Sequence, residues 1–359
     1  MTNLCSIITG TGCYLPPVVV NNKNFINNSF FNDDGSIVET PGEEITKKFE
    51  QITDIKERRC ALKQHKTSDL ATFAAQEALT DASINPESLD YIIVAHNLGD
   101  IDPNTGYSDI LPTLASRVKY KLGIKNPKVV AYDITFGCPG WTQAMIQADF
   151  FLRSGEASSA LVIGADTLSR AMDPHDRDAM IFSDGAGAVV LESRLSDKPI
   201  GMLKHSVRTD TIEHIEILKM GRSYNRNNFR DSLYLKMMGR KVYTYALSFV
   251  PTLIKECLDK NNLSLEDVKK VLVHQANAKM DEAILERLFK LYGYTKIDYN
   301  VMPMTITTLG NNSVASVPTL CDLLFKQNLN EHKVNSGDNI VMASVGAGMN
   351  INAFVYRMP

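Results

Sequence analysis

An internal repeat is the feature that most limits what this chain can fold into. Residues 77–94 resemble residues 256–273, at an offset of 179 positions in a chain of 359. Both segments contain a helical pattern, a polar turn and a short apolar strand. Further matches follow in the same order: Thr135-Phe136-Gly137-Cys138 with Thr308-Leu309-Gly310-Asn311, 149–153 with 322–326, and Gly185-Ala186-Gly187 with Gly346-Ala347-Gly348. This order favours a duplicated α/β fold over a chance likeness between helix–turn–strand units.

The duplication predicts which residues meet. We divide the chain into two halves, 1–195 and 196–359, related by pseudo-twofold symmetry. Cys138 and Asn311 then occupy equivalent turns, and His274 ends a strand whose counterpart ends at Ala95. Because the ends of equivalent strands can converge, a cysteine, a histidine and an asparagine can share one site although they lie far apart in the sequence.

The segment around Cys138 has the pattern of strand, tight turn and buried helix. Residues 129–134 favour a strand, and from residue 144 apolar side chains recur at helical spacing. Proline is common at the first position of a helix, so Pro139 would put Cys138 at the helix N-terminus, where the helix dipole lowers a thiol pKa. A small buried core cysteine explains the same local pattern equally well.

The other local signals are weaker when each is taken alone. We expect helices over 43–51, 69–81 and 114–122, a strand over 6–9 followed by a turn at 10–12, and a strand over 160–163 followed by a turn at 164–166. A histidine after an apolar strand can be a hydrogen-bonded core residue, and the turn at Asn311 can be an N-cap. The Gly-Ala-Gly segments fit neither a P-loop nor a dinucleotide-binding fingerprint.

Composition excludes several classes of protein. Hydrophobic residues make up 44% of the chain, charged residues 22%, and the net charge is −3, which gives no broad basic surface for nucleic acid. No apolar run is long enough to span a bilayer, and the N-terminus lacks a signal-peptide pattern. Six dispersed cysteines without a C-x-x-C pair predict reduced thiols in the cytoplasm and neither a disulfide framework nor a zinc site.

Taken together, the motifs resemble the 3-oxoacyl-(acyl carrier protein) synthase III family, the initiating ketosynthases of the thiolase superfamily. The resemblance runs from Ile7 to Arg357. The elements that carry it are Ile8-Thr9-Gly10-Thr11-Gly12, Asp54-Ile55-Lys56-Glu57-Arg58-Arg59, Asp133-Ile134 with Gly137-Cys138, Phe182-Ser183-Asp184-Gly185-Ala186-Gly187-Ala188, His274-Gln275-Ala276-Asn277 and Gly310-Asn311-Asn312-Ser313.

The resemblance implies a thiolase-like fold with two α/β halves in five αβαβα layers, usually as a homodimer. It also implies a two-stage reaction without a cofactor or a metal. Cys138 takes an acyl group from an acyl-CoA or acyl-carrier-protein thioester, with the backbone N–H groups of Cys138 and Ala347 as the oxyanion hole. His274 and Asn311 then bind the carbonyl of a malonyl-type or 3-oxoacyl-type carrier-protein thioester, and its decarboxylation drives a Claisen condensation. The pathway is fatty-acid initiation or a specialised lipid or polyketide pathway.

Further roles are implied for residues that contact the substrate and the carrier protein. Arg177, Gly346 and Gly348 are expected to bind substrate, and Arg240 and Lys241 to dock the acyl carrier protein, although a solvated surface charge explains either arginine equally well.

In the family, a tryptophan and an arginine enclose the adenine of coenzyme A. Lys48 and Ile52 stand at those positions here. We therefore expect a longer or carrier-bound starter.

Other functions remain as alternatives. One is an acyltransferase that passes the Cys138-bound acyl group to another nucleophile, and another is the non-catalytic subunit of a heterodimeric ketosynthase. A glutamate base would suit a hydroxymethylglutaryl-CoA synthase, and a degradative thiolase needs a second cysteine where this chain reads Ser344-Val345-Gly346. The loop with His96, Asp100 and Asp102 suggests a metal site only weakly.

Overall fold

Two mixed β-sheets organise the chain, for which the computed structural model describes residues 2–227, 232–329 and 331–359. The first sheet has the order β1-β9-β8-β4-β7 and the second has the order β10-β15-β14-β13. The strands are β1 (Asn3–Tyr14), β4 (Tyr91–Ala95), β7 (Val130–Ile134), β8 (Ser159–Thr167), β9 (Asp184–Ser196), β10 (Gly201–Thr209), β13 (Val268–Val273), β14 (Asn339–Gly346) and β15 (Asn350–Arg357).

The strand directions confirm the duplication. In the first sheet β4 runs parallel to β8, β8 antiparallel to β9 and β9 antiparallel to β1. In the second sheet β13, β14, β15 and β10 repeat these relations in the same order. The predicted division at 195/196 lies beside the end of β9.

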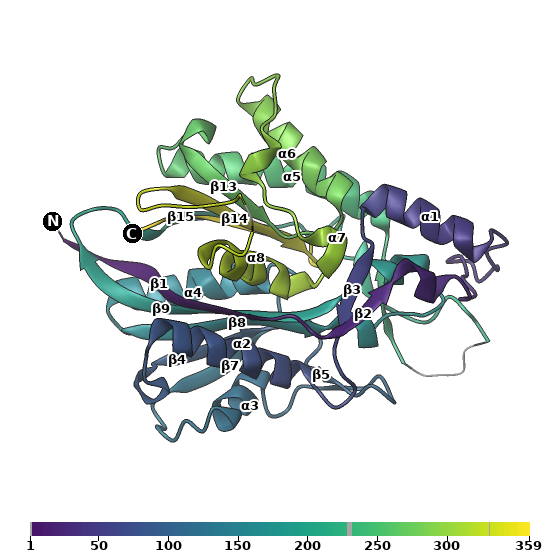
Figure 1. The fold of residues 1–359 in the computed structure, drawn as a ribbon, viewed down its shortest axis with the longest axis horizontal. Coiled ribbons are helices and arrows are strands. Elements are labelled where there is room, and N and C mark those ends of the chain that lie inside the picture. The colour runs from purple at the N-terminus through teal and green to yellow at the C-terminus, as the bar shows by residue number, and fades with distance from the viewer. Residues whose placement is uncertain (1, 228–231, 330) are drawn as a thin grey trace.

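Helices form three further layers around the sheets, as Figure 1 shows. One pair packs outside the first sheet, one pair between the sheets and one pair outside the second sheet, each over its own cluster of buried apolar residues. In that order the pairs are α2 (Thr67–Ala82) with α3 (Leu114–Lys121), α4 (Gly140–Ser154) with α8 (Ser316–Phe325), and α5 (Gly239–Lys260) with α6 (Ala278–Leu291). The predicted five-layer α/β architecture is confirmed.

At one end of the layers, α1 projects beside β2 and β3 (Figure 1). The remaining helices and strands are α1 (Gly42–Thr53), α7 (Ile306–Leu309), β2 (Val18–Asn21), β3 (Glu57–Cys60), β5 (Asp100–Ile101), β6 (Ser108–Asp109), β11 (Leu218–Gly221) and β12 (Tyr234–Met237). The 3₁₀ turns are η1 (Asn22–Phe25), η2 (Pro86–Ser88), η3 (Leu168–Arg170), η4 (Arg177–Ile181), η5 (Leu265–Asp267), η6 (Tyr299–Val301) and η7 (Ser313–Ala315). Within the described ranges, no helix is both long and apolar enough to cross a bilayer.

The three helices predicted over 43–51, 69–81 and 114–122 are confirmed as α1, α2 and α3. The prediction of glycine turns at 10–12 and 164–166 is wrong. β1 continues through Gly10 and Gly12, and β8 continues through Gly164. A Cβ atom on Gly10 would lie 2.4 Å from the carbonyl oxygen of Ala78 on α2, and one on Gly164 would lie 2.5 Å from that of Val314. These glycines therefore let a helix or turn approach the sheet closely.

Candidate active site

The predicted nucleophile lies on a tight turn between β7 and α4. Gly137 has a φ of 66°, which glycine adopts without strain, and the chain then reverses into the helix. Pro139 is the N-cap and Gly140 the first helical residue. Cys138 therefore precedes the N-cap by one residue, which places it slightly further from the helix than the sequence predicted.

Two segments from the second half of the chain meet at this turn, which belongs to the first half. His274 directly follows β13, and its Nε2 lies 2.9 Å from Oδ1 of Asn311. The backbone N–H of Ser313 donates to the same Asn311 oxygen at 2.9 Å, and the Ser313 hydroxyl donates to Sγ of Cys138 at 3.1 Å. The structure thus brings Cys138, His274 and Asn311 into one hydrogen-bonded set.

The protonation states differ from the sequence expectation. Burial raises the pKa of Cys138 to about 12, while the hydrogen bond from Ser313 opposes that rise. The prediction that this pKa lies below its usual value is therefore wrong, because desolvation of the thiolate is the largest effect on it. At neutral pH the resting side chain is a thiol, and its activation needs a base at the moment of attack.

His274 is the member of this hydrogen-bonded set whose ring can take up a proton. Its Nδ1 lies 3.1 Å from the carbonyl oxygen of Val345, and both this contact and the one to Asn311 favour the protonated ring. Burial is the larger effect and lowers the pKa of His274 below its usual value. The ring is therefore mostly neutral at pH 7 and can accept a proton.

A glycine-containing loop closes over the nucleophile. A Cβ on Gly346 would lie 2.7 Å from the backbone nitrogen of Cys138, and one on Gly137 would lie 3.0 Å from that of Ala347. Gly348 has a φ of 134°, which other residues rarely adopt. Among the described residues, the backbone N–H groups of Cys138 and Ala347 donate to no other residue, and that of Cys138 faces its own Sγ. Neither donor is committed to a neighbouring residue, as an oxyanion hole requires.

An entrance cavity of about 600 Å³ leads toward this set of residues. Its walls come from α1, η4, α5 and α6, and Asn311 lies in its lining. Of the residues predicted to contact substrate or carrier protein, Arg177 and Arg240 line the cavity and are exposed, whereas Lys241 is exposed but lies outside the lining. Gly346 lies against the nucleophile turn, and Gly348 lies two residues further along the same loop, against Asn350.

Sequence analysis missed several residues of the site. Asp178 and Lys279 line the entrance cavity, and burial raises the pKa of Asp178 to about 6. Lys48 and Ile52 line it from α1, as their place in the family pattern implied. Lys279 follows the motif at His274 by five positions, so it could have been found as a helix residue one turn beyond the catalytic strand.

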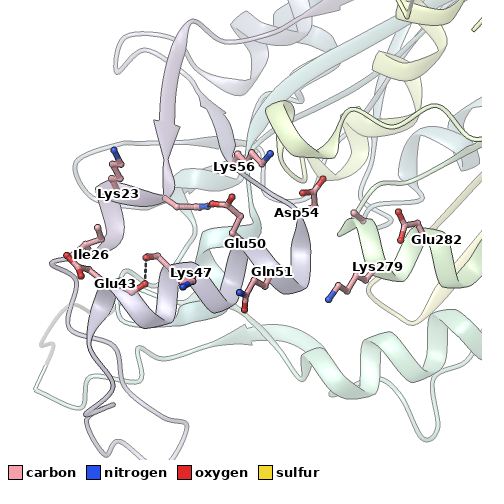
Figure 2. A pocket seen from close by; sticks show the side chains of 13 residues that line it. Lys23, Ile26, Glu43, Lys47, Glu50, Gln51, Asp54, Lys56, Lys279 and Glu282 are labelled. Carbon is pink, nitrogen blue, oxygen red and sulfur yellow. Dashed lines mark hydrogen bonds between the residues drawn. The ribbon is translucent and has the colours of Figure 1, made fainter. Parts of the chain in front are cut away.

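A second, polar cleft of about 730 Å³ lies along α1 and α6 (Figure 2). Lys279 borders both this cleft and the entrance cavity. Charges of both signs line it and include the side chains of Lys23, Glu43, Lys47, Glu50, Asp54, Lys56 and Glu282. The mixture of signs gives the cleft no net preference for an anion or a cation.

The residues weighed as a metal site have other contacts. His96 pairs with Asp133 at 3.0 Å, and Asp100 pairs with Arg117 at 2.6 Å. Asp102 accepts hydrogen bonds within its own turn. In the part of the chain that the structure describes, no three His, Cys, Asp or Glu side chains are grouped as metal ligands would be.

Comparison with known proteins identifies the fold and the family. The model of the 3-oxoacyl-[acyl-carrier-protein (ACP)] synthase III family matches residues 132–211, and the model of its C-terminal part matches residues 258–358. The two matches include Cys138, His274, Asn311 and Ala347.

Solved structures agree over almost the whole chain. A 3-oxoacyl-(acyl carrier protein) synthase III from Aquifex aeolicus is 32% identical, with a TM-score of 0.78, over 99% of this chain and 100% of that chain. The β-ketoacyl-(acyl carrier protein) synthase III of Thermus thermophilus is 29% identical, with a TM-score of 0.79, over 98% of this chain and 99% of that one. The Pseudomonas aeruginosa synthase III is 25% identical, with a TM-score of 0.80, over 99% of this chain and 98% of that one.

The duplicated five-layer fold, the convergent Cys138, His274 and Asn311, and these matches lead to one conclusion: the chain belongs to the 3-oxoacyl-(acyl carrier protein) synthase III family, the ketosynthase III-type condensing enzymes of the thiolase superfamily.

Proposed function

We propose that this condensing enzyme forms a 3-oxoacyl product in two stages on Cys138. The observation that carries the proposal is the hydrogen-bonded set of Cys138, Ser313, Asn311 and His274 beside a cavity that Asn311 lines. The substrates are thioesters, whose activated acyl carbon makes a cofactor unnecessary. The reaction therefore depends on this chain's own side chains and backbone.

In the first stage, Sγ of Cys138 attacks the carbonyl carbon of a starter thioester. Nε2 of His274 takes the thiol proton and keeps it for the second stage, the leaving thiolate takes a proton from water, and the acyl group stays on Cys138. The tetrahedral oxyanion binds to the backbone N–H groups of Cys138 and Ala347. These N–H groups donate to no other described residue, which together with the close approach of Gly346 to Cys138 supports this assignment.

In the second stage, a malonyl-type thioester enters and loses carbon dioxide. The electron pair of the broken C–C bond leaves an enolate on the thioester, and His274 and Asn311 donate to its oxygen. The enolate carbon attacks the acyl group on Cys138, whose thiolate departs and regains a proton. The two oxygen contacts of Asn311, to His274 and to the N–H of Ser313, orient its amide, so that Nδ2 is left free to donate.

We propose that an acyl carrier protein delivers at least one substrate. Lys48, Arg177, Arg240 and Lys279 line the entrance cavity, and Lys241 is exposed beside it. The four lining cations outnumber the two acidic side chains of the lining, Glu44 and Asp178. An excess of positive charge suits an acidic partner, because complementary charge speeds the encounter. The absence of an aromatic clamp at Lys48 and Ile52 favours a carrier-bound or longer starter over a small coenzyme A thioester.

A cytoplasmic homodimer is the assembly that we propose. Tyr107, Ile110 and Leu111 are exposed apolar side chains on the loop before α3, and a second copy of the chain would cover them. All six cysteines are free thiols, which suits a reducing compartment.

The alternatives differ in measurable products. An acyltransferase on this scaffold would acylate Cys138 but release no carbon dioxide from a malonyl thioester. The non-catalytic subunit of a heterodimeric ketosynthase would do neither. The arrangement of Asn311 against His274 favours the condensing enzyme, because transfer to another nucleophile needs no second donor pair at an enolate.

Intact-protein mass spectrometry with a panel of acyl-CoA and acyl-carrier-protein thioesters tests the proposal. We expect a mass gain on the wild type that is absent from Cys138→Ala, and carbon dioxide release when a malonyl-carrier-protein thioester is added. Acylation without carbon dioxide release would favour the acyltransferase. If no donor acylates the protein, the condensing mechanism is wrong.

A further inference from the structure

A chain of hydrogen bonds reaches Sγ of Cys138 from the side of Asp166. Ser313 donates its hydroxyl to Sγ at 3.1 Å, and Nδ2 of Asn97 donates to the Ser313 oxygen at 3.0 Å. Asn97 also donates to both oxygens of Asp166, from Nδ2 at 2.5 Å and from its backbone N–H at 2.9 Å. Ser313 and Asp166 are each only 1% exposed, so water does not replace these contacts.

The ionised carboxylate of Asp166 determines which group donates and which accepts in each of these hydrogen bonds. An ionised carboxylate only accepts hydrogen bonds, so Asp166 holds the Asn97 amide with its NH₂ group toward Asp166 and Ser313. The Ser313 oxygen therefore accepts from Asn97, and its own proton is free to point at Sγ. Ser313 is a hydrogen-bond donor to the sulfur and cannot serve as its base while this arrangement holds.

The backbone of Ser313 is also unusual. Its φ is 52°, in the left-handed region that glycine occupies without strain and serine does not. Strained residues of this kind concentrate at functional sites, where a particular side chain is needed. The Ser313 hydroxyl is what a glycine at this position would lack.

We propose that Ser313 is a positioning residue that donates to Cys138 Sγ and stabilises the thiolate as it forms, with Asn97 and Asp166 fixing the direction of the donation. The role rests on the proposed function of Cys138 as the nucleophile. It adds a donor on the sulfur to the backbone donors on the oxyanion. Burial and, to a smaller extent, the charge of Asp166 oppose ionisation of this thiol, and the hydrogen bond from the Ser313 hydroxyl is the larger of the two hydrogen bonds that favour it.

The substitution Ser313→Gly separates this role from the fold. Glycine accepts the observed φ without strain, and its backbone N–H can still donate to Asn311. Only the hydroxyl is lost. Two other titratable groups belong to the same hydrogen-bonded set, Asp166 on β8 and His274 after β13, and neither is changed.

The first measurement is the pH dependence of Cys138 alkylation by iodoacetamide, followed by mass spectrometry with Cys138→Ala as the blank. We expect the alkylation rate between pH 7 and pH 9, where only a small fraction of this thiol is ionised, to fall ~10-fold in Ser313→Gly, because a hydrogen bond to an ionised group changes the ionisation equilibrium by ~10-fold or more. Acylation by a thioester at pH 7 should fall ~10- to 100-fold. Decarboxylation of a malonyl thioester, which uses His274 and Asn311, should change less than ~3-fold.

Ser344→Ala is the matched control. Ser344 is 1% exposed, and its hydroxyl has no hydrogen-bond partner among the described residues, so the same kind of atom is removed at a similar depth. We expect its alkylation profile to match the wild type. A fall in rate as large as that of Ser313→Gly would overturn the proposal, because the effect would then follow from the loss of any buried hydroxyl.

A double-mutant cycle tests the part of Asn97. Asn97→Ala should lower the alkylation rate between pH 7 and pH 9 in the wild-type background and have no further effect in Ser313→Gly, because Asn97 acts through Ser313. Equal reductions of the rate in both backgrounds would overturn the relay.

Alkylation needs no substrate, so it separates the two proposals. A shifted profile in a protein that no thioester acylates would support Ser313 and refute the proposed function. If thioesters acylate the wild type normally and Ser313→Gly leaves the alkylation profile unchanged, the proposed function is supported and the role of Ser313 is refuted.

Discussion

Asn311→Ala separates the two stages of the proposed reaction. The side chain contributes one donor, Nδ2, to the enolate oxygen of the second stage, and it holds the His274 ring through Oδ1 at 2.9 Å. Attack of Cys138 on the starter uses the backbone donors of Cys138 and Ala347 and does not use the amide. The substitution should therefore impair decarboxylation and leave acylation largely intact.

The magnitude follows from the geometry. Removal of one side-chain donor from an oxyanion in a buried site costs about 3 to 4 kcal/mol, which is ~10²- to 10³-fold in rate. Asn311 is 4% exposed, so water has little room to replace the lost donor. Loss of the contact to Asn311 also removes one of the two hydrogen bonds that raise the pKa of His274, so the ring stays neutral and remains a competent base.

The assay follows carbon dioxide release from a malonyl-carrier-protein thioester and, in parallel, acyl-enzyme formation by intact-protein mass spectrometry. We expect decarboxylation to fall ~10²- to 10³-fold and acylation to change less than ~3-fold. Circular dichroism checks that the variant is folded. Decarboxylation within ten-fold of the wild type, or an equal loss of acylation, would refute the division of roles between Asn311 and the backbone donors.

Three further predictions concern stability and docking. In Gly10→Ala the new Cβ would lie 2.4 Å from the carbonyl oxygen of Ala78 on α2. We expect the free energy of unfolding, measured with urea, to fall by about 3 kcal/mol. A fall of less than about 1 kcal/mol would mean that α2 can move away from the sheet at little cost. Burial raises the pKa of Asp149 to about 6, above its unfolded value, so the contribution of this group to stability is present at pH 4 and lost by pH 7. In Asp149→Asn the difference in the free energy of unfolding between pH 4 and pH 7, measured with urea, should become smaller by about 2 to 3 kcal/mol. An unchanged difference would contradict this prediction. Lys279→Glu should lower kcat/KM for a carrier-protein thioester ~10-fold at low salt and leave kcat/KM for a small thioester unchanged. The control is Lys260→Glu, which reverses the charge of another exposed lysine. An equal loss of kcat/KM with both substrates would argue against a role of Lys279 in docking the carrier protein.

Several features of the site could be predicted because they depend on order along the chain. The repeat predicted that Cys138 and Asn311 lie in equivalent turns. It also predicted that His274, at the end of its strand, lies at the same end of the sheets. Two sheets with the same strand order and directions then brought the three residues together. The sequence pattern was enough here because a duplicated fold converts equal positions in two halves into neighbouring positions in space.

The glycines of β1 and β8 show where sequence reasoning failed. Gly10, Gly12 and Gly164 were expected in turns, since glycine often marks a turn. Each instead lies within a strand at a point where backbone from another element approaches too closely for a side chain. Such an approach involves residues far away in the sequence, so no local pattern encodes it.

The sequence by itself determined the α/β class, the duplication and the identity of Cys138, His274 and Asn311, because periodicity and motif order are properties of the chain. Only the tertiary structure decided the protonation states and the hydrogen-bond partners of these residues. Burial, set by the packing of all five layers, raises the pKa of Cys138 although a helix begins beside it. The Asp166–Asn97–Ser313 chain joins positions 166, 97 and 313, and its direction follows from contacts that exist only once the two halves have packed together.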